Sequence, residues 1–194
     1  MTKNELIERL SVSMESRMVD ILTTIAEERF LVKDPDGHFT IDDLIELTFF
    51  SKKDVAFRFA WILEYSFVNY PCIGPHLDHF LRGFARQDNP SCMRHYGKIA
   101  AFFTGKKVIG LSERQLEETD LEPLVDTLFA WLIDEQVLVA TKVHCMQALA
   151  NLAPRYPWIK DELLQTIYHL EDKESIAFFG RAKQVKKQLA KMKI

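Results

Sequence analysis

The stretch VHCMQALANLAPRYPWIKDELL, which runs from Val143 to Leu164, contains the pattern that decides the fold. Its first half is rich in alanine and carries apolar residues at helical spacing up to a break at Tyr156-Pro157. Its second half, from Trp158 onward, is amphipathic at the same spacing. A helix, a break and a second helix predict a hairpin, which cannot bury its apolar face alone. We therefore expect neighbouring hairpins that share a core.

Helix starts elsewhere in the chain are marked by a capping residue followed three positions later by a polar residue. These pairs are Thr2 with Glu5, Thr40 with Asp43, Ser51 with Asp54 and Ser112 with Gln115. Ser13 is a further capping candidate, and Asn89 precedes a proline at a first helical position. Asp34-Pro35-Asp36-Gly37 is the strongest turn signal. The pattern predicts about ten helices and no strand, the last four at about residues 121–133, 139–152, 158–170 and 175–191.

The composition is typical of a globular protein of one domain. Hydrophobic residues make up 47% and charged residues 27% of the 194 residues. The formal net charge of −3 gives no overall attraction to nucleic acid or to an anionic membrane. No apolar run approaches the roughly 18 residues of a membrane span, and the charged N-terminus differs from a signal peptide. We therefore expect a cytoplasmic protein with no membrane partner.

The three cysteines, Cys72, Cys92 and Cys145, are an odd number at wide spacing. This pattern predicts free, buried thiols in a reducing compartment. A zinc site needs clustered ligands, and the sequence has no C-x-x-C pair. It also lacks a phosphate-binding loop, a dinucleotide fingerprint and a nucleophile elbow. The sequence therefore predicts no metal, no cofactor and no catalytic residues, and it favours a protein that is not an enzyme.

Two breaks in the chain repeat at a fixed distance. Aligning Tyr70 with Tyr156, each followed by proline, gives an offset of 156 − 70 = 86 residues, or two periods of about 43. In this alignment Leu63 falls on Leu149. A period of about 40–47 residues with two helices per unit resembles the HEAT and armadillo repeats. The resemblance covers about residues 55–189.

The resemblance implies an all-α protein, folded as a right-handed α–α superhelix of about four to five helical hairpins. It implies one domain, residues 1–194, in which residues 1–50 are N-terminal capping helices and residues 51–194 are HEAT-like repeats. An insertion around residues 106–119 lengthens one loop. An irregular helical bundle is the alternative architecture.

The candidate binding surface lies on the predicted helix that follows Pro75. His76 and His79 lie three residues apart and share a face of that helix, and Arg82 and Arg86 continue the stripe. The second helix of each HEAT hairpin lines the concave side of the stack, so the resemblance makes this stripe a surface for an acidic partner. A solvated helix face is the alternative. Two histidines alone lack the third ligand that a metal site needs.

Three other groups of residues have ordinary structural explanations. His144 and Cys145 are adjacent, and neighbours on a helix point about 100° apart, so they cannot act as base and nucleophile. Aromatic residues crowd residues 49–67, where core packing is the expected use. The last helix carries Arg181, Lys183, Lys186, Lys187, Lys191 and Lys193. These residues could contact phosphate, but we expect them to keep a capping helix soluble.

Stacked hairpins offer a long surface without a catalytic pocket, so we expect a non-catalytic protein-interaction or scaffold module. Its expected partner is another protein. The alternative is a nucleic-acid-binding protein similar to the HEAT-like DNA glycosylases that excise alkylated bases, which requires a basic concave face. An adenylosuccinate lyase is not favoured, because the G-S-S-x-M-P-x-K-x-N loop of those enzymes is absent. The sequence does not decide the oligomeric state.

Overall fold

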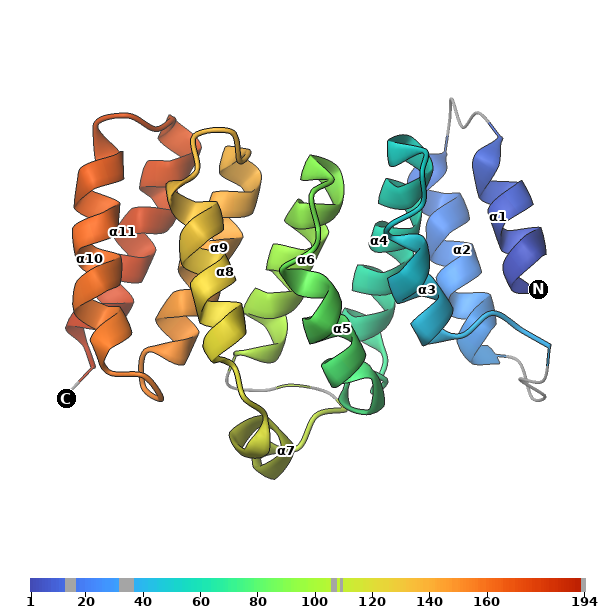
Figure 1. Cartoon of the computed structure of the whole chain (residues 1–194), viewed down its shortest axis with the longest axis horizontal. Coiled ribbons are helices and arrows are strands. Elements are labelled where there is room, and N and C mark those ends of the chain that lie inside the picture. Colours follow the sequence, from blue (N-terminus) through green and yellow to red (C-terminus); the bar gives the residue numbers. More distant parts are fainter. Residues whose placement is uncertain (13–16, 32–36, 106–107, 109, 193–194) are drawn as a thin grey trace. The chain divides into compact units, whose positions relative to one another are not determined.

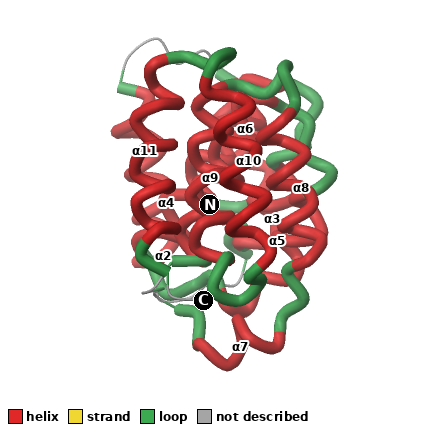
Figure 2. The backbone as a smooth tube through the Cα atoms, turned by 90° about the vertical axis from the view of Figure 1, so that its left-hand side faces the viewer, coloured by secondary structure: helices red, strands yellow, loops and turns green. Residues whose placement is uncertain are grey.

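The computed structural model describes residues 1–12, 17–31, 37–105, 108 and 110–192. Over these residues the chain forms helices and loops, and no strand (Figure 2). The helices are α1 (Lys3–Ser11), α2 (Met18–Leu31), α3 (Ile41–Leu47), α4 (Lys53–Asn69), a 3-10 turn η1 (Gly74–His76), α5 (Leu77–Phe84), α6 (Pro90–Phe103), α7 (Glu113–Glu118), α8 (Glu122–Ile133), α9 (Val139–Leu152), α10 (Trp158–Glu171) and α11 (Ile176–Ala190). The all-α fold class is therefore confirmed. None of the described helices is long and apolar enough to cross a bilayer.

Two of the predicted capping boxes are confirmed. Thr2 and Glu5 bond each other's backbone N–H groups at the start of α1, and Thr40 and Asp43 do the same at α3. At α6 the Asn89 side chain accepts a hydrogen bond at 3.1 Å from the backbone N–H of Ser91, the first N–H group of the helix because Pro90 has none. These side chains satisfy donors that a helix start leaves without an internal partner.

The predicted cap at Ser51 is wrong. Helix α4 begins at Lys53, and its N-cap residue, Lys52, makes no side-chain hydrogen bond to the helix. Burial decides the position of α4 instead, since the helix is apolar on more than one face. The predicted cap at Ser13 and the turn signal at residues 34–36 lie outside the described residues.

The chain forms two compact units. Unit 1 comprises residues 1–92 and 109–111, and unit 2 comprises residues 93–108 and 112–194. The predicted boundary after residue 50 falls inside unit 1, and the prediction of a single domain stays a prediction.

The centre of unit 1 is α4, which packs between α2 and α3 (Figure 1). Seven of its apolar side chains are fully buried, namely Val55, Ala56, Phe59, Ala60, Ile62, Leu63 and Phe67. The guanidinium of Arg58 donates to the carbonyl oxygens of Leu10 and Val12 at 2.5 and 2.7 Å. This buried side chain therefore ties the C-terminal end of α1 to α4. Helix α5 packs beside α3.

A short return of the chain completes unit 1. The carbonyl oxygen of Gly110 accepts a hydrogen bond from the backbone N–H of Gly74 at 3.0 Å. Gly110 has a φ of +79°, and a Cβ atom there would lie 2.3 Å from the carbonyl carbon of Pro71. Only glycine fits this approach of two backbones.

In unit 2, α9 packs against α8 on one side and α11 on the other, and α10 covers both α9 and α11 (Figure 1). Helix α6 approaches α9 at Gly97, where a Cβ atom would lie 3.2 Å from the Cβ of His144. Helices α9 and α11 thus lie side by side, with α8 against α9 and α10 against both, and α6 meets α9 at Gly97. Arg155 attaches the small α7 by donating to the carbonyl oxygens of Leu116, Glu117 and Thr119 at 2.7–3.2 Å.

The 86-residue offset aligns buried positions but not helix ends. Leu63 and Leu149 are both fully buried, as the alignment requires. Tyr70 is the C-cap residue of α4, whereas α9 ends at Leu152, well before Tyr156. The difference has a physical cause, since Pro154 has no N–H group with which to continue α9.

Candidate binding site

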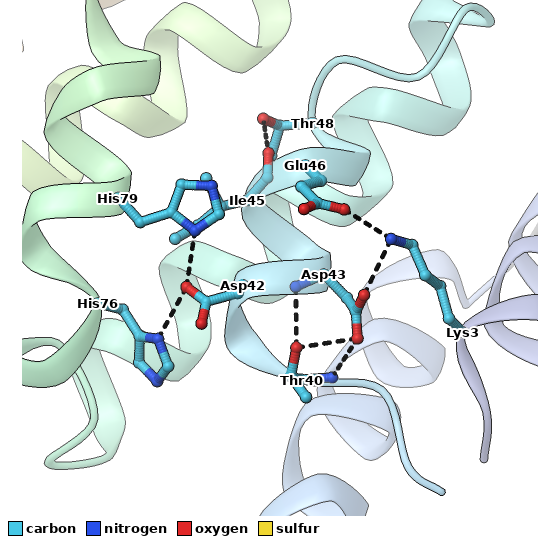
Figure 3. Close-up of polar contacts among 9 residues, drawn as sticks. All are labelled: Lys3, Thr40, Asp42, Asp43, Ile45, Glu46, Thr48, His76 and His79. Carbon is cyan, nitrogen blue, oxygen red and sulfur yellow. Dashed lines mark hydrogen bonds and ion pairs between the residues drawn. The ribbon is translucent and has the colours of Figure 1, made fainter.

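The two predicted histidines share one carboxylate oxygen. The Nδ1 atoms of His76 and His79 lie 2.9 and 2.7 Å from Oδ1 of Asp42 (Figure 3). Asp42 comes from α3, so the cluster joins α3 to η1 and α5. Its neighbour Asp43 points the other way, to Lys3, because successive residues of a helix face different directions.

The chemistry of the cluster follows from this geometry. An ionised carboxylate can only accept hydrogen bonds, so the Nδ1–H group of each imidazole is the donor to Asp42. Burial raises the pKa of the Asp42 carboxyl. The hydrogen bonds from His79 and His76, together with their charges, lower this pKa by more than burial raises it, so it lies below its usual value of 3.8. Both imidazoles are half-buried, with 23% and 30% of their side chains exposed. The two histidines are therefore not simply part of an open stripe, since Asp42 orients each imidazole.

The two predicted arginines are exposed. The guanidinium carbon of Arg86 lies 5.3 Å from the centre of the Phe49 ring, which is a cation–π distance. Of the four predicted residues, only His79 and Arg82 lie within α5, since His76 ends η1 and Arg86 follows the helix. The structure thus brings the two histidines together, and it adds Asp42 and Phe49, which the sequence reasoning missed. Both come from α3 or its end, and no local pattern links them to α5.

The cluster differs from a catalytic centre. An Asp–His hydrogen bond orients the general base of serine hydrolases. Here Asp42 is the only described residue that hydrogen-bonds either imidazole, so neither ring activates a hydroxyl or a thiol within the described chain. The described residues include no group of three side chains arranged to hold a metal ion.

The three cysteines are free, as predicted, and are protonated at neutral pH. Cys92 and Cys145 are buried and Cys72 is half-buried. Burial raises the pKa of the Cys72 thiol to about 11 and that of Cys92 to about 12, and it raises the pKa of Cys145 further. Because the thiolate is the reactive form, these side chains are packing residues rather than nucleophiles.

A second feature, in unit 2, was not recognised from the sequence. Helices α6, α9 and α11 contain no Asp or Glu, although they carry seven Lys or Arg residues. The backing helices α8 and α10 carry five acidic residues and one lysine. The absence of acidic residues from these helices is visible in the sequence, but it defines a surface only when the helices lie side by side.

The chain matches no protein-family model, no curated protein and no solved structure. The resemblance to HEAT and armadillo repeats therefore stays a proposal.

Proposed function

We propose that this protein is a non-catalytic interaction module, a stack of HEAT- or armadillo-like hairpins that binds an acidic segment of another protein. Arg82 and Arg86 carry the proposal, because both are exposed and follow the His76–Asp42–His79 cluster along the chain. A right-handed superhelix is the architecture that we propose for the stack.

The packing inside unit 2 supports the repeat architecture. Helices α8 and α9 form one hairpin, α10 and α11 form the next, and α9 contacts both of its neighbours. Two successive hairpins therefore share a core, as stacked repeats do. A chain built this way offers surface along its helices rather than an enclosed catalytic pocket.

The side chains around α5 support a protein partner with carboxylates. Arginine presents N–H donors in a fixed fork that pairs with a carboxylate through two hydrogen bonds. Arginine and aromatic residues are also enriched at the energetic centres of protein interfaces. The Phe49 ring beneath Arg86 limits the freedom of that guanidinium before binding, which lowers the entropy lost on association.

The test is capture of partners by the tagged full-length protein from its native lysate after nuclease treatment, with quantification by mass spectrometry. The Arg82→Ala/Arg86→Ala variant should reduce recovery of a specific protein partner at least tenfold, as expected for the loss of two interface arginines. The matched control is Lys52→Ala/Lys53→Ala, which removes two exposed positive charges from the same unit.

Two results would contradict the proposal. One is equal loss of the partner in the arginine variant and in the lysine control, since net charge alone would then explain binding. The other is that partners are recovered only from lysate that has not been treated with nuclease. Circular dichroism of both variants checks that the fold is retained.

A further inference from the structure

We infer that unit 1 contains a binding site for a small monocarboxylate with an apolar body, in a cavity next to the start of α1 and the end of α2. The cavity has a volume of about 320 Å³, and its lining includes Ile25, Glu28, Arg29, Leu31, His38 and Phe39. This volume falls within the range of small-molecule sites. The site goes beyond the proposed protein interaction, because none of the four residues of the predicted α5 stripe lines it.

The positive group of the lining is Arg29, in the last turn of α2. Its Nε–H group donates to the carbonyl oxygen of Phe39 at 2.7 Å. The backbone N–H of Phe39 donates in turn to the carbonyl oxygen of Met1 at 3.0 Å. Both backbone polar groups of Phe39 are thus bonded, so the guanidinium is held against a fixed segment of the chain.

The bond to Phe39 leaves most of the Arg29 guanidinium available. It uses one of five N–H groups, and its acceptor is a neutral carbonyl, so the positive charge stays uncompensated. The two terminal NH₂ groups have no hydrogen-bond or ionic partner within the described chain. They are the donors with which arginine binds a carboxylate through two parallel hydrogen bonds.

A second polar group of the lining also lacks a partner. The Nδ1 atom of the half-buried His38 is closed to water and makes no hydrogen bond to the described residues. A buried polar atom without a partner destabilises the fold, and a ligand or an ordered water that supplies one removes this cost. Because the χ2 torsion of histidine is broad, the ring can turn this nitrogen toward a ligand at little cost.

Two carboxylates lie near the cavity, and both are engaged elsewhere. Glu28 belongs to the lining, but its carboxylate lies 3.8 Å from the guanidinium of Arg9. Glu5 lies close enough to His38 for their charges to interact, and its carboxylate accepts a backbone N–H at 2.8 Å in the capping box of α1. Arg29 is therefore the charged group of the lining that has no ionic partner among the described residues.

The rest of the lining is apolar and favours an apolar body on the ligand. Ile25 is fully buried and Phe39 is 2% exposed, whereas Leu31 is 78% exposed and can be covered by a ligand. Apolar surface that leaves water on binding contributes affinity in proportion to its area. The lining thus fits an amphipathic anion better than inorganic phosphate, which has no apolar surface.

A cavity of about 480 Å³ in unit 2 lacks comparable free donors. Its lining includes Lys142, Glu174, Lys173 and His169. Lys142 pairs with Glu174 at 2.5 Å, and Nζ of Lys173 lies 3.0 Å from Nε2 of His169. Both lysines are thus already bonded within the cavity, in contrast to the terminal NH₂ groups of Arg29.

The test is calorimetric titration of the full-length protein with hexanoate at pH 7. Saturable binding is expected, with a dissociation constant of about 1 mM or tighter for a ligand of this size. Butyrate is shorter by two methylene groups and should bind about tenfold more weakly. Hexanamide keeps the shape of hexanoate but lacks its charge, so it should also bind about tenfold more weakly.

Two pairs of variants locate the site. Arg29→Gln removes the charge and should weaken hexanoate binding about tenfold, whereas Lys53→Gln, at an exposed lysine of α4, should leave it unchanged. Because Arg29 also bonds Phe39, the second pair leaves that bond intact. Leu31→Glu places a carboxylate in the lining and should weaken binding about fivefold, and Val19→Glu, at another exposed apolar position of α2, should not. Circular dichroism checks that each variant is folded.

Several results would overturn the inference. One is the absence of saturable hexanoate binding up to about 10 mM. Others are equal binding of hexanamide or hexylamine, since the charge of Arg29 would then play no part, and equal weakening by Leu31→Glu and Val19→Glu. Tighter binding of inorganic phosphate than of hexanoate would overturn the carboxylate assignment. The partner-capture experiment changes neither Arg29 nor Leu31, so either proposal can fail without the other.

Discussion

Replacing Lys142 with Met should destabilise unit 2 by about 3 kcal/mol, because the change leaves the Glu174 carboxylate buried without a partner. The Lys142 ammonium donates to Glu174 Oε1 at 2.5 Å, and the two side chains are only 2% and 12% exposed. Methionine occupies nearly the volume of the lysine stem, so lost packing contributes little. The effect is therefore mainly electrostatic.

The magnitude follows from opposing effects. With an effective dielectric constant of 20, two unit charges 2.5 Å apart attract by about 332/(20 × 2.5), or roughly 7 kcal/mol. Removing each ion from water costs several kcal/mol, so the intact pair contributes little net stability. Breaking such a pair costs about 3–5 kcal/mol, and the partial exposure of Glu174 to water places the value at the lower end.

The assay is urea unfolding at pH 7, followed by circular dichroism and tryptophan fluorescence, for the single and double variants. Lys142→Met/Glu174→Gln removes both charges and should cost only about 1 kcal/mol, so the double variant should be about 2 kcal/mol more stable than Lys142→Met alone. A single variant that loses less than about 1 kcal/mol would refute the reasoning. So would a double variant as unstable as the single one, because the cost would then come from packing.

Three further predictions concern the core, a backbone contact and the histidine cluster. Leu149→Ala should lower the free energy of unfolding by about 2–5 kcal/mol, since the side chain is fully buried, whereas Leu138→Ala at an exposed position should change it by less than about 0.5 kcal/mol in the same urea titration. Gly110→Ala should lower the free energy of unfolding by about 2–4 kcal/mol, because its Cβ would lie 2.3 Å from a neighbouring backbone carbon. Gly37 has a similar φ of +78° but open space around it, so Gly37→Ala should cost only about 1–2 kcal/mol. Equal losses of stability in the two variants would contradict the steric explanation. Asp42→Asn should cost roughly 0.5–1 kcal/mol above about pH 4, where the carboxylate is ionised in the folded and unfolded chain. Because the pKa of Asp42 is lower in the folded chain, this difference in the free energy of unfolding should shrink as the pH falls below the pKa of the unfolded chain. A difference that stayed constant down to pH 2 in acid titrations of both proteins would contradict the ionic interaction.

Local signals predicted the helices well, because their causes act within a few residues. The boxes at Thr2 and Thr40 bond backbone groups three residues away, so the sequence alone locates those helix starts. The buried positions of α4 and α9 follow from apolar spacing in the same way. The cap predicted at Ser51 failed, since the tertiary packing of α4 set its start at Lys53.

The sequence predicted only part of the candidate site. Spacing placed His76 and His79 near each other, but Asp42 lies more than 30 residues earlier and meets them only because α3 packs beside α5. The half-burial of the imidazoles has the same cause. A helical wheel of α5 cannot show a carboxylate that arrives from another helix.

By itself the sequence determined the helical class, most helix boundaries, the free thiols and the absence of acidic residues from three segments. Only the tertiary structure decided that α9 and α11 lie side by side in unit 2, and that Lys142 and Lys186 pair with the acidic residues Glu174 and Glu171. Composition counts charges along the chain, whereas a binding surface depends on which charges share a direction in space. That direction is set by helix packing, which joins residues too distant in sequence for any local pattern to relate.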